Sequence, residues 1–227
     1  MCTLAHVFEA AGLATVALVA IRPVAERMRP PRALYGDFPL GRPLGQPADR
    51  AFQHDVLRRA FALLEAACGP VLDDHPAVIV ADETPLSCAL PPRYDADLPP
   101  AVDEARGLSA AYQRSRAMTG RTSVGRVMDA DTVPDALRIL DDVAAGTPWA
   151  EAGIPAEDTT ATVLDIRAYY EEAALSLVEG PALGARQAEK WFYQSTAAGR
   201  TVVAAQRRMK ESNAPFSVWF YMGPGHR

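Results

Sequence analysis

The feature that most constrains the fold is an apolar run with β-branched members at residues 14–21. Such a continuous run is typical of a strand buried on both faces. The residues before it, 3–11, repeat apolar side chains at helical spacing, and Gly12 is expected to end that helix. We therefore predict a short helix that leads directly into the first strand of a sheet.

The next segments continue this alternation of helix and strand. A short helix is expected over residues 22–28, and residues 33–38 are predicted to form a second strand. The order helix, strand, helix, strand predicts an α/β fold, with a parallel sheet flanked by helices. A long amphipathic helix capped by Asp49 follows, and then a third strand at residues 77–81.

The second half of the chain is predicted to be mostly helical. Glycine and proline separate its helical patterns, which cover residues 101–119, 134–145, 160–178 and 184–212. The proline-rich stretch 85–100 is expected to be a surface loop or a lid, and the aromatic segment 215–222 a last strand or a docking tail. We expect an α/β domain with the candidate active site over residues 1–100 and a helical region packing on it over residues 101–227, or else one single domain.

Composition excludes several classes of partner. The chain carries a net charge of -5 at pH 7, so it has no overall basic character for nucleic acid or anionic lipid. Its longest apolar stretch, residues 12–21, is too short to cross a bilayer. Three cysteines, an odd count, argue against a disulfide framework, and the four histidines lack the paired spacings of metal sites. We expect a cytoplasmic protein with no membrane or nucleic-acid partner and with no metal or cofactor of its own.

Three segments, in order along the chain, carry a resemblance to a known family. They are CTLAHVFEAAGLATV at residues 2–16, PLGRP at 39–43 and VLRRAFALLE at 56–65. Together they resemble the B-subunit family of glycine, sarcosine, betaine and D-proline reductases. The resemblance implies reductive cleavage of a small substrate, with Cys2 at the place of the family's reactive cysteine or selenocysteine. Because a strand precedes the active-site helix in that family, it also implies a partner subunit that supplies this strand.

Cys2 is the candidate nucleophile on physical grounds as well. A thiol at the start of a helix lies near unsatisfied N–H groups, which favour the thiolate. His6 follows four residues later on the same helix face, with Glu9 one turn beyond, so the three form a candidate catalytic line. If Met1 is removed, the free α-amine of Cys2 could itself act as the base. The alternatives are a frayed terminus for Cys2 and a packing role for His6.

The proline- and glycine-rich stretch 39–47 is the second candidate site element. Its glycines let backbone N–H groups approach a ligand, and Arg42 can hold a carboxylate or phosphate. Just upstream, Arg32 and Asp37 are assigned to the end of the second strand, where open α/β sheets bind ligands. A tight turn over the core is the alternative for this loop. The predicted substrate-binding residues are Arg32, Asp37, Pro39, Leu40, Gly41, Arg42 and Gly45.

These observations predict a thiol-dependent, reductase-like enzyme that acts on a small anionic substrate. Cys2 would attack the substrate, His6 would manage the proton, and an external thiol would be the reductant; a homo-oligomer is expected. Two alternatives stay open: a non-catalytic or partial subunit of a larger reductase complex, and a small-ligand-binding protein. Of the other cysteines, Cys68 is expected to be a buried apolar residue, and Cys88 either a resolving thiol or an inert one.

Overall fold

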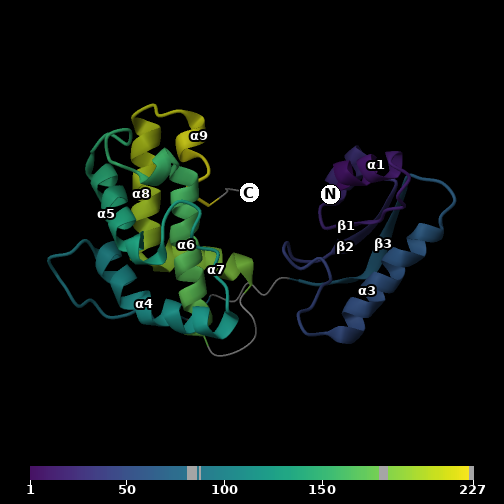
Figure 1. The fold of residues 1–227 in the computed structure, drawn as a ribbon, viewed down its shortest axis with the longest axis horizontal. Helices are drawn as coiled ribbons and strands as arrows, with labels where there is room; N and C mark the ends of the chain where they lie inside the picture. Colours follow the sequence, from purple (N-terminus) through teal and green to yellow (C-terminus); the bar gives the residue numbers. More distant parts are fainter. Residues whose placement is uncertain (81–85, 87, 179–183, 225–227) are drawn as a thin grey trace. The chain divides into compact units, whose positions relative to one another are not determined.

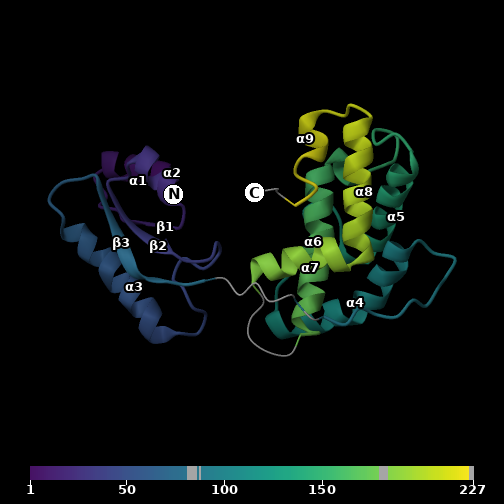
Figure 2. The ribbon, with the colours of Figure 1, turned by 180° about the vertical axis from the view of Figure 1, so that it is seen from behind.

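The chain forms two units. The computed structural model describes residues 1–80, 86, 88–178 and 184–224. Contacts within the chain separate Met1–Asp82 from Glu83–Arg227. The first unit contains a parallel sheet with helices, and the second is helical (Figures 1 and 2). The predicted α/β fold with a mostly helical C-terminal half is confirmed.

The sheet of the first unit is built from alternating helices and strands. Among the described residues it has three parallel strands in the order β1-β2-β3, with Ala17 opposite Ala33 and Leu34 opposite Asp73. The central strand is therefore β2. The elements are α1 (Cys2–Ala10), β1 (Ala17–Val19), α2 (Arg22–Met28), β2 (Arg32–Asp37), α3 (Arg50–Ala62), the 3-10 turn η1 (Leu63–Glu65) and β3 (Val71–Val78).

Helices cover both faces of this sheet, with α1 and α2 on one face and α3 on the other (Figures 1 and 2). On the α3 face, Val56 packs with Leu34 of β2 and with Phe38 in a buried apolar cluster. On the other face, the Arg22 guanidinium of α2 lies over the Tyr35 ring, 5.3 Å from its centroid. Neighbouring residues of β2 thus face opposite layers, as the strand pleat requires.

A carboxylate at the end of α1 joins the first elements of the unit. Glu9 accepts hydrogen bonds from the backbone N–H of Thr15 at 2.7 Å, from the Thr15 hydroxyl at 3.1 Å and from Arg32 Nη1 at 2.7 Å. Arg32 also donates from Nη2 to the Ala66 carbonyl at 3.0 Å. These bonds connect α1, the segment entering β1, the first residue of β2 and the segment after η1.

The third strand begins earlier than predicted. It starts at Val71 instead of in the predicted range 77–81, of which Ala81 lies outside the described residues. The start of β3 is hard to recognise from sequence, because Asp and Pro are depleted in strands and β3 contains Asp73, Asp74 and Pro76. Its place at the sheet edge tolerates them, and Asp74 forms an ion pair with Arg22. The first strand is also shorter than its predicted range of 14–21.

The second unit is a bundle of helices around an aromatic core. Its largest fully buried side chains include Tyr112, Tyr170, Phe192 and Leu140. The main helices were predicted close to their observed bounds. The elements are α4 (Pro100–Thr119), η2 (Ala130–Thr132), α5 (Val133–Ala145), η3 (Pro155–Glu157), α6 (Thr159–Leu175), α7 (Ala185–Ser195), α8 (Ala197–Glu211) and α9 (Phe216–Trp219).

The predicted helix over 184–212 is interrupted at Thr196. The Thr196 hydroxyl accepts from the backbone N–H of Gly199 at 2.9 Å, which caps the start of α8. The Glu104 carboxylate of α4 accepts from the backbone N–H of Ala197 at 2.8 Å. Two side chains therefore satisfy the first N–H groups of α8, and the chain forms two helices in place of one.

Residues 215–222 and 85–100 were the two remaining segments with a structural prediction. The prediction of a strand at residues 215–222 is wrong, because Pro215 precedes the short helix α9 and Met222 is buried in the helical core. In the proline-rich stretch 85–100, the described residues before α4 lie outside helices and strands, and Leu90 packs against the same core. Pro85 and Ser87 lie outside the described residues.

A buried carboxylate in α6 holds the loop that leads to η2. Asp165 is 0% exposed and accepts hydrogen bonds of 2.9–3.3 Å from the backbone N–H groups of residues 125–128. Burial disfavours the charged carboxylate, but these donors outweigh burial and lower the pKa of Asp165. Asp165 therefore ties an irregular loop to the bundle.

Replacing Glu9 with Gln should destabilise the first unit at neutral pH. Chiefly through the Thr15 N–H, with help from Arg32, the fold lowers the pKa of Glu9 from its ordinary value of 4.5. Because the folded-state pKa is lowered, the stabilisation is present above the unfolded value and is lost as pH falls through the folded value. The three tryptophans belong to the second unit, so urea unfolding should be followed by circular dichroism. The unfolding midpoints of wild type and Glu9→Gln should differ at neutral pH and converge in acid; a gap independent of pH would contradict this role.

Replacing Asp165 with Ala should destabilise the second unit by about 3 kcal/mol, because four backbone donors lose a buried acceptor. Urea unfolding followed by tryptophan fluorescence measures the loss. Asp135→Ala, at an exposed carboxylate in the first turn of α5, is the matched control and should change little. Equal effects of the two variants would refute the assigned role of Asp165.

Candidate functional site

Cys2 is the first residue of α1, so it lies at the positive end of the helix dipole. Among the described residues, no side chain caps this end of α1, so its first backbone N–H groups lack a side-chain acceptor. Cys2 is only 8% exposed and, with Ala5, forms the buried face of the helix. The thiol therefore belongs to the helix and is packed against the unit.

The course of α1 places Cys2 toward the carboxyl ends of the strands. Glu9 holds the last turn of α1 beside Arg32, which begins β2 at the opposite, amino edge. From there α1 runs back along the sheet, and Cys2 lies seven residues, or about 10 Å of helix, from Glu9. Figures 1 and 2 show the N-terminus at the end of the unit where the strands finish. Open parallel sheets bind ligands at this edge.

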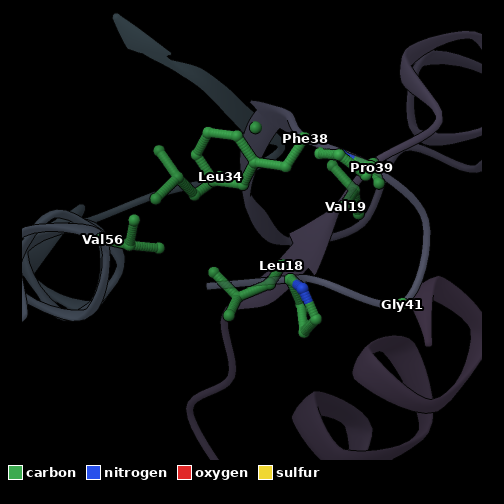
Figure 3. Close-up of a pocket in the computed structure, with 10 residues that line it drawn as sticks. Leu18, Val19, Leu34, Phe38, Pro39, Gly41 and Val56 are labelled. Carbon is green, nitrogen blue, oxygen red and sulfur yellow. The ribbon is translucent and has the colours of Figure 1, made fainter. Parts of the chain in front are cut away.

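A small apolar cavity lies at the same edge, on the α3 face. Its volume is about 60 Å³, and it is lined at the carboxyl ends of β1 and β2 and by the loop that follows. Figure 3 shows Leu18, Leu34 and Val56 around this space, with Pro39 and Gly41 of the loop on another side. The complete lining is Leu18, Val19, Ala20, Leu34, Gly36, Phe38, Pro39, Gly41, Pro43 and Val56.

The loop over residues 39–45 is shaped by two successive turns. The Arg42 N–H donates to the Pro39 carbonyl at 3.0 Å, and the Gly45 N–H donates to the Arg42 carbonyl at 2.9 Å. Gly41 and Gly45 have φ values of 86° and 81°, which favour glycine. Gly45 is buried against the Phe52 ring, so closely that an added Cβ would overlap the ring. The loop therefore has a defined conformation that depends on its glycines.

Arg42 is the cation of this loop that stays available. Its chain neighbours Gly41 and Pro43 both line the cavity, and its own side chain is half-buried. Within the described residues, the Arg42 guanidinium has no hydrogen bond or ion pair. A guanidinium presents donors in a planar fork that matches a carboxylate or phosphate. The loop therefore combines a cation that can bind an anionic group with backbone that lines a small apolar cavity.

Two predicted site residues, Arg32 and Glu9, lie at the amino edge of the sheet, away from the cavity. Arg32 is the first residue of β2, so its assignment to the end of that strand is corrected. Five residues separate it from Asp37, or about 16 Å along a strand. The Arg32 and Glu9 side chains are joined to each other and to the backbone there. Asp37 ends β2 at the carboxyl edge, where its carboxylate adds to burial in raising the pKa of Tyr35.

His6 is tied to α2. Its Nε2 lies 2.9 Å from the Met28 carbonyl, and since a carbonyl only accepts, Nε2 carries the proton in this contact. The ring nitrogen left to accept a proton is Nδ1. His6 is exposed whereas Cys2 is buried, and among the described residues no hydrogen bond joins the two.

The other two cysteines have different environments from that of Cys2. Cys68 is exposed, which corrects its expected burial: it follows η1, beyond the last packed turn of α3. Cys88 belongs to the second unit and packs half-buried against the helical core. Burial raises the pKa of the Cys88 thiol, which disfavours its thiolate.

Sequence reasoning missed the cavity-lining residues Leu18, Leu34, Gly36 and Val56. Apolar periodicity marks such positions as core, and only the three-dimensional arrangement distinguishes a filled core from a cavity. Gly36 carried a signal in principle, because a glycine inside a strand often marks a close approach of other groups. An added Cβ at Gly36 would overlap the Phe38 ring.

Comparison with protein-family models, with curated proteins and with solved structures yielded no match to this chain. In the described part of the chain, no group of three or more His, Cys, Asp or Glu side chains is placed to hold a metal ion. None of the helices described is long and apolar enough to span a membrane.

Gly41→Ala and Gly45→Ala should separate the two roles of glycine in the loop. Both positions have positive φ, so each substitution strains the backbone by about 1 kcal/mol. An added Cβ at Gly41 meets no atom within 4 Å, whereas at Gly45 it meets Phe52 and Ile79. Gly45→Ala should therefore lower the urea midpoint of the first unit clearly more than Gly41→Ala. Equal losses would show that the loop does not pack on α3 as described.

Proposed function

We propose that the first unit is a thiol-dependent, reductase-like module that acts on a small anionic substrate at the carboxyl edge of its sheet. Cys2 is the nucleophile, and Arg42 binds the anionic group. The observation that carries the proposal is the course of α1, which returns Cys2 to the edge of the cavity and of Arg42, a cation without a partner among the described residues. The resemblance of residues 2–16 and 39–43 to the reductase B subunits supports the same assignment.

The chemistry needs a leaving group on a carbon next to an electron-withdrawing group. The Cys2 thiolate displaces the leaving group and forms a thioether, and His6 Nδ1 is the candidate to accept the thiol proton. An external thiol then attacks the Cys2 sulfur; the substrate carbon departs as a stabilised carbanion and takes up a proton. Cys2 is left in a mixed disulfide, which a second external thiol reduces. Two external thiols thus become one disulfide for each bond cleaved.

Alkylation with a matched pair of reagents tests this site. Iodoacetate and iodoacetamide deliver the same kind of electrophilic carbon, but only iodoacetate is anionic. If Arg42 orients anions toward Cys2, the ratio of iodoacetate to iodoacetamide rates should be higher at Cys2 than at exposed Cys68, as read by peptide mass spectrometry. Arg42→Gln should lower the ratio at Cys2 to that at Cys68, by about tenfold if one charge-assisted contact is lost.

Cys68 and Cys2 variants complete the experiment. Cys68→Ser should leave the reactivity of Cys2 unchanged, and Cys2→Ser should abolish thiol-dependent turnover of a small α-substituted carboxylate. A Cys2 that reacts no faster than a free peptide thiol, or an Arg42→Gln variant with an unchanged ratio, would reject the proposal.

A second candidate is a partial subunit of a larger complex. The outer face of α1 favours it, because Leu4, Val7 and Phe8 are 48%, 57% and 45% exposed although they are large and apolar. β1, at the sheet edge, also has one side without a strand partner among the described residues. Native mass spectrometry of the chain from its own cells would distinguish a hetero-complex from an independent enzyme.

A further inference from the structure

The last helix carries a cluster of exposed aromatic side chains. Phe216, Phe220 and Tyr221 are 56%, 45% and 62% exposed, and Trp219 is half-buried beside them. The Phe216 and Phe220 rings stack with centroids 4.2 Å apart, and Trp219 and Tyr221 make edge contacts with Phe220. We call these four residues the C-terminal aromatic patch. Single exposed apolar residues are ordinary, but a contiguous cluster marks an interaction surface.

Backbone carbonyls help to hold α9 in place, together with Val218, Trp219 and Met222, whose side chains pack in or against the helical core. Gln206 of α8 donates to the Trp219 carbonyl at 3.0 Å, and the Tyr193 hydroxyl donates to the Met222 carbonyl at 2.7 Å. The Thr159 hydroxyl donates to the Val218 carbonyl. The segment is anchored through three carbonyls while its rings stay at the surface. Figures 1 and 2 show α9 beside the end of α8, at one end of the helical unit.

Cationic side chains of α8 lie beside the patch although the chain as a whole is acidic. The described residues 200–224 contain four basic side chains and one acidic one, in a chain of net charge -5. Lys210 Nζ lies 5.2 Å from the centroid of the Trp219 ring, and exposed Arg207 precedes Lys210 by one turn of α8. The negative net charge of the whole chain does not reveal this local excess of basic residues.

We propose that the C-terminal aromatic patch docks the protein peripherally on an anionic lipid surface. Aromatic rings insert favourably at the membrane interface, and cations beside them attract anionic headgroups. Charge complementarity selects this partner: a second copy would bring positive patches face to face. Single-stranded nucleic acid needs free ring faces for base stacking, and in the Phe216–Phe220 pair each ring already has one face covered by the other. The inference concerns the second unit and is independent of the chemistry proposed for Cys2.

Vesicle co-sedimentation of the full chain tests the proposal. The protein should sediment with vesicles of phosphatidylcholine containing phosphatidylglycerol, should not sediment with phosphatidylcholine alone, and should be released by salt. The double variant Phe216→Ser with Phe220→Ser should partition about tenfold more weakly. Lys210→Ala and Arg207→Ala should each weaken partitioning about fivefold. Circular dichroism confirms that the variants are folded.

Phe61→Ser is the matched control, because Phe61 is 59% exposed on α3 but lies in the other unit and outside the patch. It should leave vesicle binding unchanged. No binding to anionic vesicles, equal binding to neutral ones, or an equal loss with Phe61→Ser would overturn the proposal. So would an effect of the patch variants confined to binding of a single-stranded oligonucleotide, or to self-association in sedimentation equilibrium.

Discussion

The first unit depends on the carboxylate of Glu9. One side chain joins α1 to the segment entering β1 and, through Arg32, to β2 and the segment after η1. A unit as small as Met1–Asp82 buries little apolar surface of its own, so a partly buried ion pair between its elements has more influence than a surface pair would. This network lies at the amino edge of the sheet, whereas Arg42, for which the described residues supply no hydrogen bond or ion pair, belongs to the loop at the carboxyl edge.

Much of the fold could be predicted from local sequence, because glycine, proline and apolar periodicity mark the ends and faces of helices. Asp49 does cap α3, and α2 has the predicted bounds 22–28. The failures have physical causes. β3 contains aspartate and proline that only an edge position tolerates. The aromatic residues near 216–219 favour a strand, but the described part of the second unit holds no strand for them to pair with.

The candidate site was harder to foresee, because its residues meet through tertiary structure. Helical spacing placed Cys2, His6 and Glu9 on one face, yet the fold gives each a different environment. Cys2 is on the buried face of α1, and His6 contacts the Met28 carbonyl. Glu9 accepts hydrogen bonds from Thr15 and Arg32. In contrast, the glycines of the 39–45 loop were recognisable from sequence, because positive φ values are a property of the backbone itself. The cavity beneath them was not.

The way α9 is anchored has a consequence for how such a surface can change. Carbonyl oxygens of Val218, Trp219 and Met222 accept its hydrogen bonds, and the side chains of the same three residues pack in or against the helical core. The exposed side chains at positions 216, 220 and 221 are thereby uncoupled from the bonds that hold the segment. Mutation can therefore replace these rings, and so change what the surface binds, without disturbing the contacts that hold the helical unit together.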